Sequence, residues 1–103
     1  MDTSDEATTG PAPDAFPRII GEDGEPIGRV IRFDAGWLGC DRMPMIQRRQ
    51  LQAVEVGDVV EFVVYDPSSK EDVPPFARML GHRVRWIKPQ EDGALRIAVE
   101  RMR

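Results

Sequence analysis

The sequence is poor in residues that bind metals or form cross-links, with one cysteine and one histidine among 103 residues. A single cysteine cannot form an internal disulfide bond. The two residues together also fall short of the roughly four protein ligands that a self-contained zinc site usually needs. We therefore expect no bound metal, and the lack of disulfide bonds makes a reducing, cytoplasmic location the default expectation.

Long hydrophobic runs are missing as well. The longest apolar stretch, Val59 to Tyr65, is interrupted by Glu61, so nothing approaches the ~20 apolar residues of a transmembrane helix. The first fifteen residues contain four acids, no base and no apolar run, which is unlike a secretory signal peptide. We therefore expect no membrane partner and no secretion signal.

Basic residues are almost absent from the first part of the chain. Residues 1–28 contain seven acidic residues and one basic residue, Arg18, whereas the remainder contains 13 basic and 11 acidic residues. Because residues 1–17 lack hydrophobic periodicity, we predict a disordered acidic tail there. Residues 18–103 are expected to form a single domain, since the chain is too short for a second core. The net charge of −4 argues against a dedicated nucleic-acid-binding protein.

The spacing of apolar residues predicts alternating strands and helices. In chain order we expect a strand at 18–21 paired through Asp23-Gly24 with a strand at 28–34, a helix at 44–54, a strand at 59–65, a second helix ending at Gly81, and strands at 83–87 and 95–100. In the strand at 83–87, Val84 and Trp86 are expected to alternate with the charged residues and so to share one face. The order β-α-β-α-β-β is typical of an α/β (α+β) two-layer sandwich. We expect two helices on one face of a four-stranded mixed sheet, with an extra strand at the N-terminus.

The second predicted helix is expected to begin at an N-cap pair formed by Ser69 and Asp72. Pro74 and Pro75 are tolerated only in a first helical turn, which agrees with that start. Its buried stripe is expected to consist of Phe76, Met79 and Leu80.

Cys40 is the residue most suited to covalent chemistry. It follows a predicted strand and the loop Gly36-Trp37-Leu38-Gly39, and a helix is expected within a few residues. A helix N-terminus presents unpaired N–H groups and the positive end of the helix dipole, which both favour a thiolate over a thiol. Gly39 leaves room for close approach by a partner. We therefore predict a reactive Cys40; the alternative is a small buried residue without reactivity.

A set of motifs surrounds this cysteine at fixed spacing. The set comprises Phe33-Asp34 before Cys40, Val56-Gly57-Asp58 after the first helix, and Asp66-Pro67 and Asp72-Val73-Pro74 after the next strand. Over about residues 31–101 the chain resembles the TusA/SirA-like sulfur-carrier family. The resemblance implies that Cys40 accepts sulfane sulfur as a persulfide from a donor protein of the cysteine desulfurase or rhodanese type and passes it to an acceptor protein. It implies no cofactor, and we expect a monomer.

The Cys-Pro-x-Pro motif of that family is replaced by Cys40-Asp41-Arg42-Met43, with Pro44 one position later. The helix could therefore begin at Pro44 and leave Cys40 nearly a turn away, or a rearranged first turn could keep it close. The overall spacing favours the second arrangement. Asp41 disfavours a thiolate at Cys40 whereas Arg42 favours it, and the sequence leaves the balance open.

The candidate residues around the sulfur are Gly39, Asp41, Arg42 and Met43. Met45, Arg48 and Arg49 are candidates for contacts with a partner protein, although two such arginines also fit a solvated helix face. We expect Met43 or Met45, or both, in the core.

Two other functions are alternatives to a sulfur relay. One is a non-catalytic protein-binding or regulatory module that keeps the fold and has lost persulfide chemistry. The other is a nucleic-acid-binding domain that uses Arg83, Arg85 and Lys88, although alternating charges on a strand usually mark its solvent side.

Overall fold

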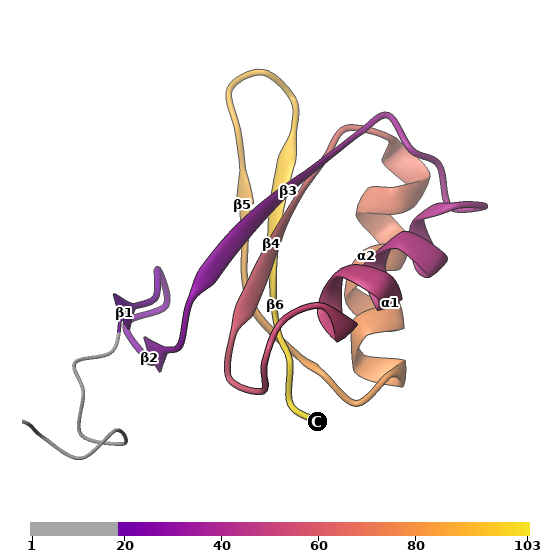
Figure 1. Ribbon diagram of the computed structural model, residues 1–103. Coiled ribbons are helices and arrows are strands. Elements are labelled where there is room, and N and C mark those ends of the chain that lie inside the picture. Colours follow the sequence, from indigo (N-terminus) through magenta and orange to yellow (C-terminus); the bar gives the residue numbers. More distant parts are fainter. Residues whose placement is uncertain (1–18) are drawn as a thin grey trace, which may run out of the picture.

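Residues 19–103 are described by the structure, a computed structural model in which two helices cover one face of a four-stranded sheet (Figure 1). The predicted tail, 1–17, lies outside the described residues. The elements are β1 (Ile19–Ile20), β2 (Pro26–Ile27), β3 (Val30–Gly36), α1 (Met43–Gln52), β4 (Val59–Val64), α2 (Pro67–Met79), β5 (Arg83–Pro89) and β6 (Leu95–Glu100). The predicted two-layer sandwich and its element order are confirmed.

The four-stranded sheet has the strand order β3-β4-β6-β5. β3 and β4 are parallel, because α1 carries the chain back along the sheet between them. The pairs β4–β6 and β5–β6 are antiparallel, and a tight turn with Gly93 at a φ of 91° joins the last two strands. The sheet is therefore mixed, as predicted.

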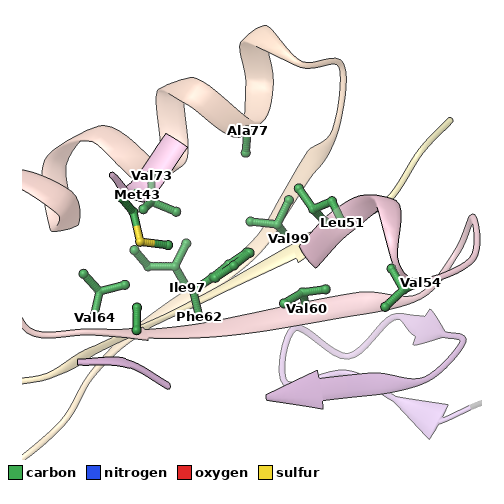
Figure 2. Packing of buried hydrophobic residues seen from close by; sticks show 11 residues of the cluster. Met43, Leu51, Val54, Val60, Phe62, Val64, Val73, Ala77, Ile97 and Val99 are labelled. Atoms are coloured by element: carbon green, nitrogen blue, oxygen red, sulfur yellow. The ribbon is translucent and has the colours of Figure 1, made fainter. Parts of the chain in front are cut away.

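The main hydrophobic core fills the space between the sheet and the helices (Figure 2). β4 contributes Val60, Phe62 and Val64 at every second position, as the alternation of side chains along a strand requires. Residues of α1 and α2 close the core from the other side; these are Met43, Leu51, Val73 and Ala77. Burial of these side chains fixes both helices on the same face of the sheet.

The opposite face of the sheet carries a smaller cluster of Ile27, Val59, Trp86 and Ala98. β1 pairs with β2, at Ile19 with Ile27 and Ile20 with Pro26. The predicted pairing of the 18–21 strand with 28–34 is therefore wrong. A tight turn, in which the Gly21 N–H donates to the Glu25 carbonyl over 2.8 Å, brings 26–27 back beside β1, and β3 pairs with β4 instead.

β5 contains a bulge that breaks the predicted alternation of its side chains. Val84 lies opposite Val99 and Trp86 opposite Ala98, so Arg85 is an extra residue between them. As a result Val84 packs against the helix-side core, whereas Trp86 belongs to the cluster on the opposite face. The prediction that Val84 and Trp86 lie on the same face of the sheet is therefore wrong.

Arg85 is also not a solvent-facing charge. Its side chain is 2% exposed, with Nε 2.6 Å from the Asp23 carboxylate and Nη1 2.9 Å from that of Glu100. The predicted solvent side of β5 is therefore wrong at this position. A guanidinium buried in two ion pairs cannot contact a phosphate backbone, so the strand surface that we considered for nucleic acid lacks its central residue.

The start and the buried face of α2 also differ from expectation. Asp66, not Ser69, is the N-cap residue, and its carboxylate accepts the N–H groups of Ser68 and Ser69 over 2.9 and 3.2 Å. The helix therefore begins earlier, at Pro67, and Pro74 and Pro75 lie inside it rather than in its first turn. The buried residues of α2 are Ser69, Val73, Pro74 and Ala77. Of the predicted stripe, Met79 is 70% exposed, and Phe76 and Leu80 are only partly buried.

Candidate functional site

Cys40 lies in the segment between β3 and α1, and its side chain is exposed. The carbonyl of Gly39 accepts the N–H groups of Arg42 and Met43 over 3.1 and 2.9 Å. These bonds form a turn that leads directly into α1, which begins at Met43 with Arg42 as its N-cap residue and Pro44 in its first turn. The arrangement is therefore a rearranged first turn, not a helix that begins at Pro44.

The first turn of α2 holds this segment in place. The Ser69 hydroxyl donates to the Leu38 carbonyl over 2.6 Å, and the Cys40 N–H donates to the Ser68 hydroxyl oxygen over 3.3 Å. Ser68 in turn donates to the Asp66 carboxylate over 2.5 Å. Figure 1 shows the beginnings of α1 and α2 at the same end of the helix layer, next to this segment. Cys40 therefore lies where the N-termini of both helices meet.

Two carboxylates border the turn. A Cβ atom at Gly39 would lie 3.1 Å from Asp41 Oδ1 and 3.8 Å from Asp66 Oδ2, so the position leaves little room for a side chain. The hydrogen bonds donated by the Ser68 side chain and the Ser69 backbone hold the pKa of Asp66 below its usual value. Asp66 therefore carries a negative charge at neutral pH, close to the cysteine.

The supply of unpaired N–H groups at the turn is smaller than expected. Those of Cys40, Arg42 and Met43 already have acceptors in the protein. Within residues 19–103, the N–H groups of Gly39, Asp41 and Met45 have no acceptor. These three groups and the side chains around the turn are the donors that remain to stabilise an anion on Cys40.

The other predicted residues separate into three groups. Met43 is 1% exposed and belongs to the core, whereas Met45 is 63% exposed. Arg49 is exposed and its Nη2 lies 3.8 Å from Met45 Sδ, one turn away on α1. Arg48 is exposed too, but it lines a hollow beside the C-terminal segment. The structure therefore brings Met45 and Arg49 together and separates them from Arg48.

Two features of the site were missed in the sequence. Ser68, which holds the Cys40 N–H, shows no signal apart from its place after Asp66-Pro67. Trp37 is 72% exposed and its ring lies 5.6 Å from that of Tyr65. The Tyr65 hydroxyl donates to Asp92 over 2.8 Å, and this bond raises the pKa of Tyr65. A tryptophan in a loop between two glycines is the signal that could have indicated an exposed aromatic surface.

Neither a membrane helix nor a metal cluster occurs in the part of the chain that the structure describes. Over residues 19–103, no helix has the length and apolar character needed to cross a bilayer. The same residues contain no group of three His, Cys, Asp or Glu side chains placed to hold a metal ion.

Comparisons with known proteins point to one family. A protein-family model described as sulfurtransferase TusA matches residues 43–101, which begin three positions after Cys40. A putative sulfur carrier protein of Archaeoglobus fulgidus is 36% identical over 74 residues, which cover 72% of this chain and 100% of that protein. The sulfur carrier protein TusA of Pseudomonas putida is 30% identical over 60 residues, or 58% of this chain and 72% of that protein. The chain therefore belongs to the TusA family of sulfur carrier proteins.

Proposed function

We propose that Cys40 carries sulfane sulfur as a persulfide from a donor protein, of the cysteine desulfurase or rhodanese type, to an acceptor protein. The observation that carries this proposal is an exposed thiol on a turn that both helices hold in place. Membership of the TusA family supports it. Because the family match begins at Met43, the role of Cys40 itself rests on its exposure and its position.

The transfer needs only thiol chemistry. The Cys40 thiolate attacks the outer sulfur of a donor persulfide, R–S–SH. The S–S bond of the donor breaks as a new one forms at Cys40, which gives Cys40–S–SH and the donor thiolate, R–S⁻. No oxidant or reductant is consumed, since one S–S bond replaces another. An acceptor thiolate then attacks the outer sulfur on Cys40 in the same way and releases the Cys40 thiolate.

The neighbouring residues have distinct roles in this proposal. Gly39 keeps the approach to the sulfur open and closes the turn through its carbonyl. Arg42 supplies a positive charge that favours an anionic persulfide, and the carboxylate of Asp41 opposes it. Met45, paired with Arg49 on the exposed face of α1, offers a soft apolar contact to a partner. Because persistent thiols need a reducing compartment, we place the relay in the cytoplasm.

The proposal is tested by loading the protein with a small persulfide. After incubation with glutathione persulfide, intact-mass spectrometry is expected to show a gain of one sulfur atom in the wild type and none in Cys40→Ser. Dithiothreitol should then return the loaded protein to its original mass. Ser68→Ala keeps the thiol but removes the acceptor of the Cys40 N–H, and we expect it to load more slowly. Equal labelling of wild type and Cys40→Ser, or no labelling of either, would contradict the proposal.

A second candidate function is a protein-binding module without persulfide chemistry. The observation in its favour is that three N–H groups of the turn are already bonded and that two carboxylates border Gly39. It predicts that iodoacetamide alkylates Cys40 at pH 7 no faster than an unstructured cysteine peptide. Faster alkylation, together with sulfur loading, would decide for the carrier.

A further inference from the structure

A cationic hollow lies at the far end of α1 from Cys40. It has a volume of about 230 Å³, and Arg48, His82, Arg101 and Arg103 line it above Leu51 and Leu80. These side chains come from α1, from the turn after α2 and from the segment after β6. The ten residues of α1 extend over about 15 Å, so this basic hollow is distinct from the cysteine turn.

In the part of the chain that the structure describes, no acidic side chain neutralises the positive charges of the basic hollow. Within residues 19–103, no Asp or Glu side chain forms an ion pair with Arg48, Arg101 or Arg103. On the opposite face of the sheet, by contrast, Arg85 and Arg96 each contact two carboxylates. Among the described residues, the basic hollow therefore gathers three cationic side chains that have no acidic partner.

His82 is the titratable side chain that lines the basic hollow. Burial, and then the positive charges of Arg101 and Arg103, hold the pKa of His82 below its usual value. Its Nδ1 accepts the Met102 N–H over 3.1 Å, so the neutral ring carries its proton on Nε2. In this form His82 presents a donor, like the guanidinium groups beside it. The charged and imidazole side chains of the basic hollow thus offer donors, and the amide of Gln52, which also lines it, can donate or accept.

Part of the hollow is fixed by the backbone around it. Arg101 donates from Nη1 to the carbonyls of Gln52 and Val54, at the end of α1, and from Nε to the Arg103 main-chain oxygen over 2.9 Å. Arg103 lies over Gly81, where a Cβ would come within 2.8 Å of its Nε. Gly81 also has a φ of +86°, which favours glycine. Arg101 therefore has a structural role, whereas Arg48 and Arg103, both exposed, form no side-chain hydrogen bond with any residue of 19–103.

We propose that the basic hollow binds a phosphate-type oxyanion, either free phosphate or the terminal phosphate of a monoester. A tetrahedral anion with several acceptor oxygens matches converging guanidinium groups and an imidazole N–H. A hollow of about 230 Å³ has room for such a group. This site is separate from the sulfur chemistry proposed for Cys40 and does not depend on it.

The single histidine of the sequence gives a direct reporter. The full chain is titrated with inorganic phosphate at pH 7 and constant ionic strength, and the His82 imidazole resonance is followed by proton NMR. We expect a saturable shift. Arg48→Gln and Arg103→Gln should each weaken binding about tenfold or more, because each removes a charge-assisted hydrogen bond. Arg49→Gln is the matched control: it removes the same charge from the next residue of α1, outside the hollow, and should change affinity less than about twofold.

Two further outcomes complete the test. A parallel titration with glycerol 3-phosphate distinguishes free phosphate from a phosphate monoester as the ligand. If the ester binds as tightly as phosphate, the ligand is assigned as a monoester. If only phosphate binds, the ligand is assigned as the free ion. A shift that stays linear in phosphate, or equal affinities for the wild type, Arg48→Gln and Arg103→Gln, would overturn the proposal. Saturable binding of single-stranded RNA without saturable binding of phosphate would overturn it as well.

Discussion

Met43 and Met45 occupy the first turn of α1 and provide a matched pair of residues for a test of the site. Met43 was a candidate near the sulfur and Met45 a candidate for partner contacts; the first is 1% exposed and the second 63% exposed. Figure 2 shows the Met43 side chain directed into the core between the helices and the sheet. We infer that Met43 anchors the start of α1, and with it the cysteine turn, and that Met45 contributes nothing to stability.

The size of the effect follows from the buried side chain. Replacing Met43 with alanine removes three side-chain heavy atoms from the core, or about 2.4 kcal/mol at ~0.8 kcal/mol per buried group. A residual cavity adds to this loss, and buried methionine-to-alanine changes cost about 2–5 kcal/mol in practice. We therefore expect Met43→Ala to lower the free energy of unfolding by about 3 kcal/mol. Met45→Ala should stay within about 0.5 kcal/mol of the wild type.

Urea unfolding, followed by circular dichroism, measures the difference. With an m-value of about 1–3 kcal/mol/M, a loss of 3 kcal/mol moves the midpoint down by about 1–3 M. Sulfur loading of folded Met43→Ala should be slower, because the turn that carries Cys40 ends at this residue, whereas loading of Met45→Ala from a small persulfide should be unchanged. Equal midpoints for the two variants, or a loss below about 1 kcal/mol for Met43→Ala, would refute the assignment of Met43 to the core.

Two further predictions concern the face of the sheet opposite the helices. Glu61 is 1% exposed and accepts from Arg32, Trp86 and Arg96. Glu61→Ala should cost about 1–3 kcal/mol in urea unfolding, because the buried Trp86 Nε1–H loses its acceptor, whereas Arg96 keeps Glu22. Glu91→Ala, in the exposed turn before β6, is the control, and equal losses would count against the network. The hydrogen bonds from Arg85 lower the pKa of Asp23 to about 2, below the unfolded value of 3.8. The ionised carboxylate therefore stabilises the fold fully above about pH 4, and this stabilisation is lost as the pH falls through about 2. In a Trp37→Phe background, the fluorescence of Trp86 should change over that pH range, because Gly21 packs against Trp86. Asp23→Asn should abolish the change, and an identical transition in both proteins would contradict this linkage.

Local sequence signals predicted those elements whose side chains alternate without interruption. β4 and β6 contribute residues to the main core at every second position, and strands with this composition and spacing can be predicted without knowledge of neighbouring elements. The amphipathic pattern likewise predicted α1, whose observed range, Met43–Gln52, agrees with the predicted 44–54 within two residues at either end. Cys40 was identified because a lone cysteine before a helix is visible in the sequence, and the structure places it on the surface.

Local signals failed where a partner distant in the sequence decides the conformation. The bulge at Arg85 exists because its guanidinium reaches Asp23 and Glu100, and it reverses the side of the sheet on which Trp86 lies. In α2, the cap at Asp66 and the packing of Val73 and Ala77 keep Pro74 and Pro75 inside a helix, because burial of that face outweighs the missing N–H groups.

The amino-acid sequence by itself determined the order of strands and helices, the sulfur-carrier family and the position of the single cysteine before a helix, because hydrophobic periodicity and motif spacing are properties of neighbouring residues. Only the tertiary structure decided what surrounds that cysteine and which basic side chains of the described residues lie together. Ser68 reaches the Cys40 N–H from 28 positions away, and Arg48, His82 and Arg103 line one hollow from three parts of the chain. Contacts of this kind arise only when packing of the core brings distant segments together.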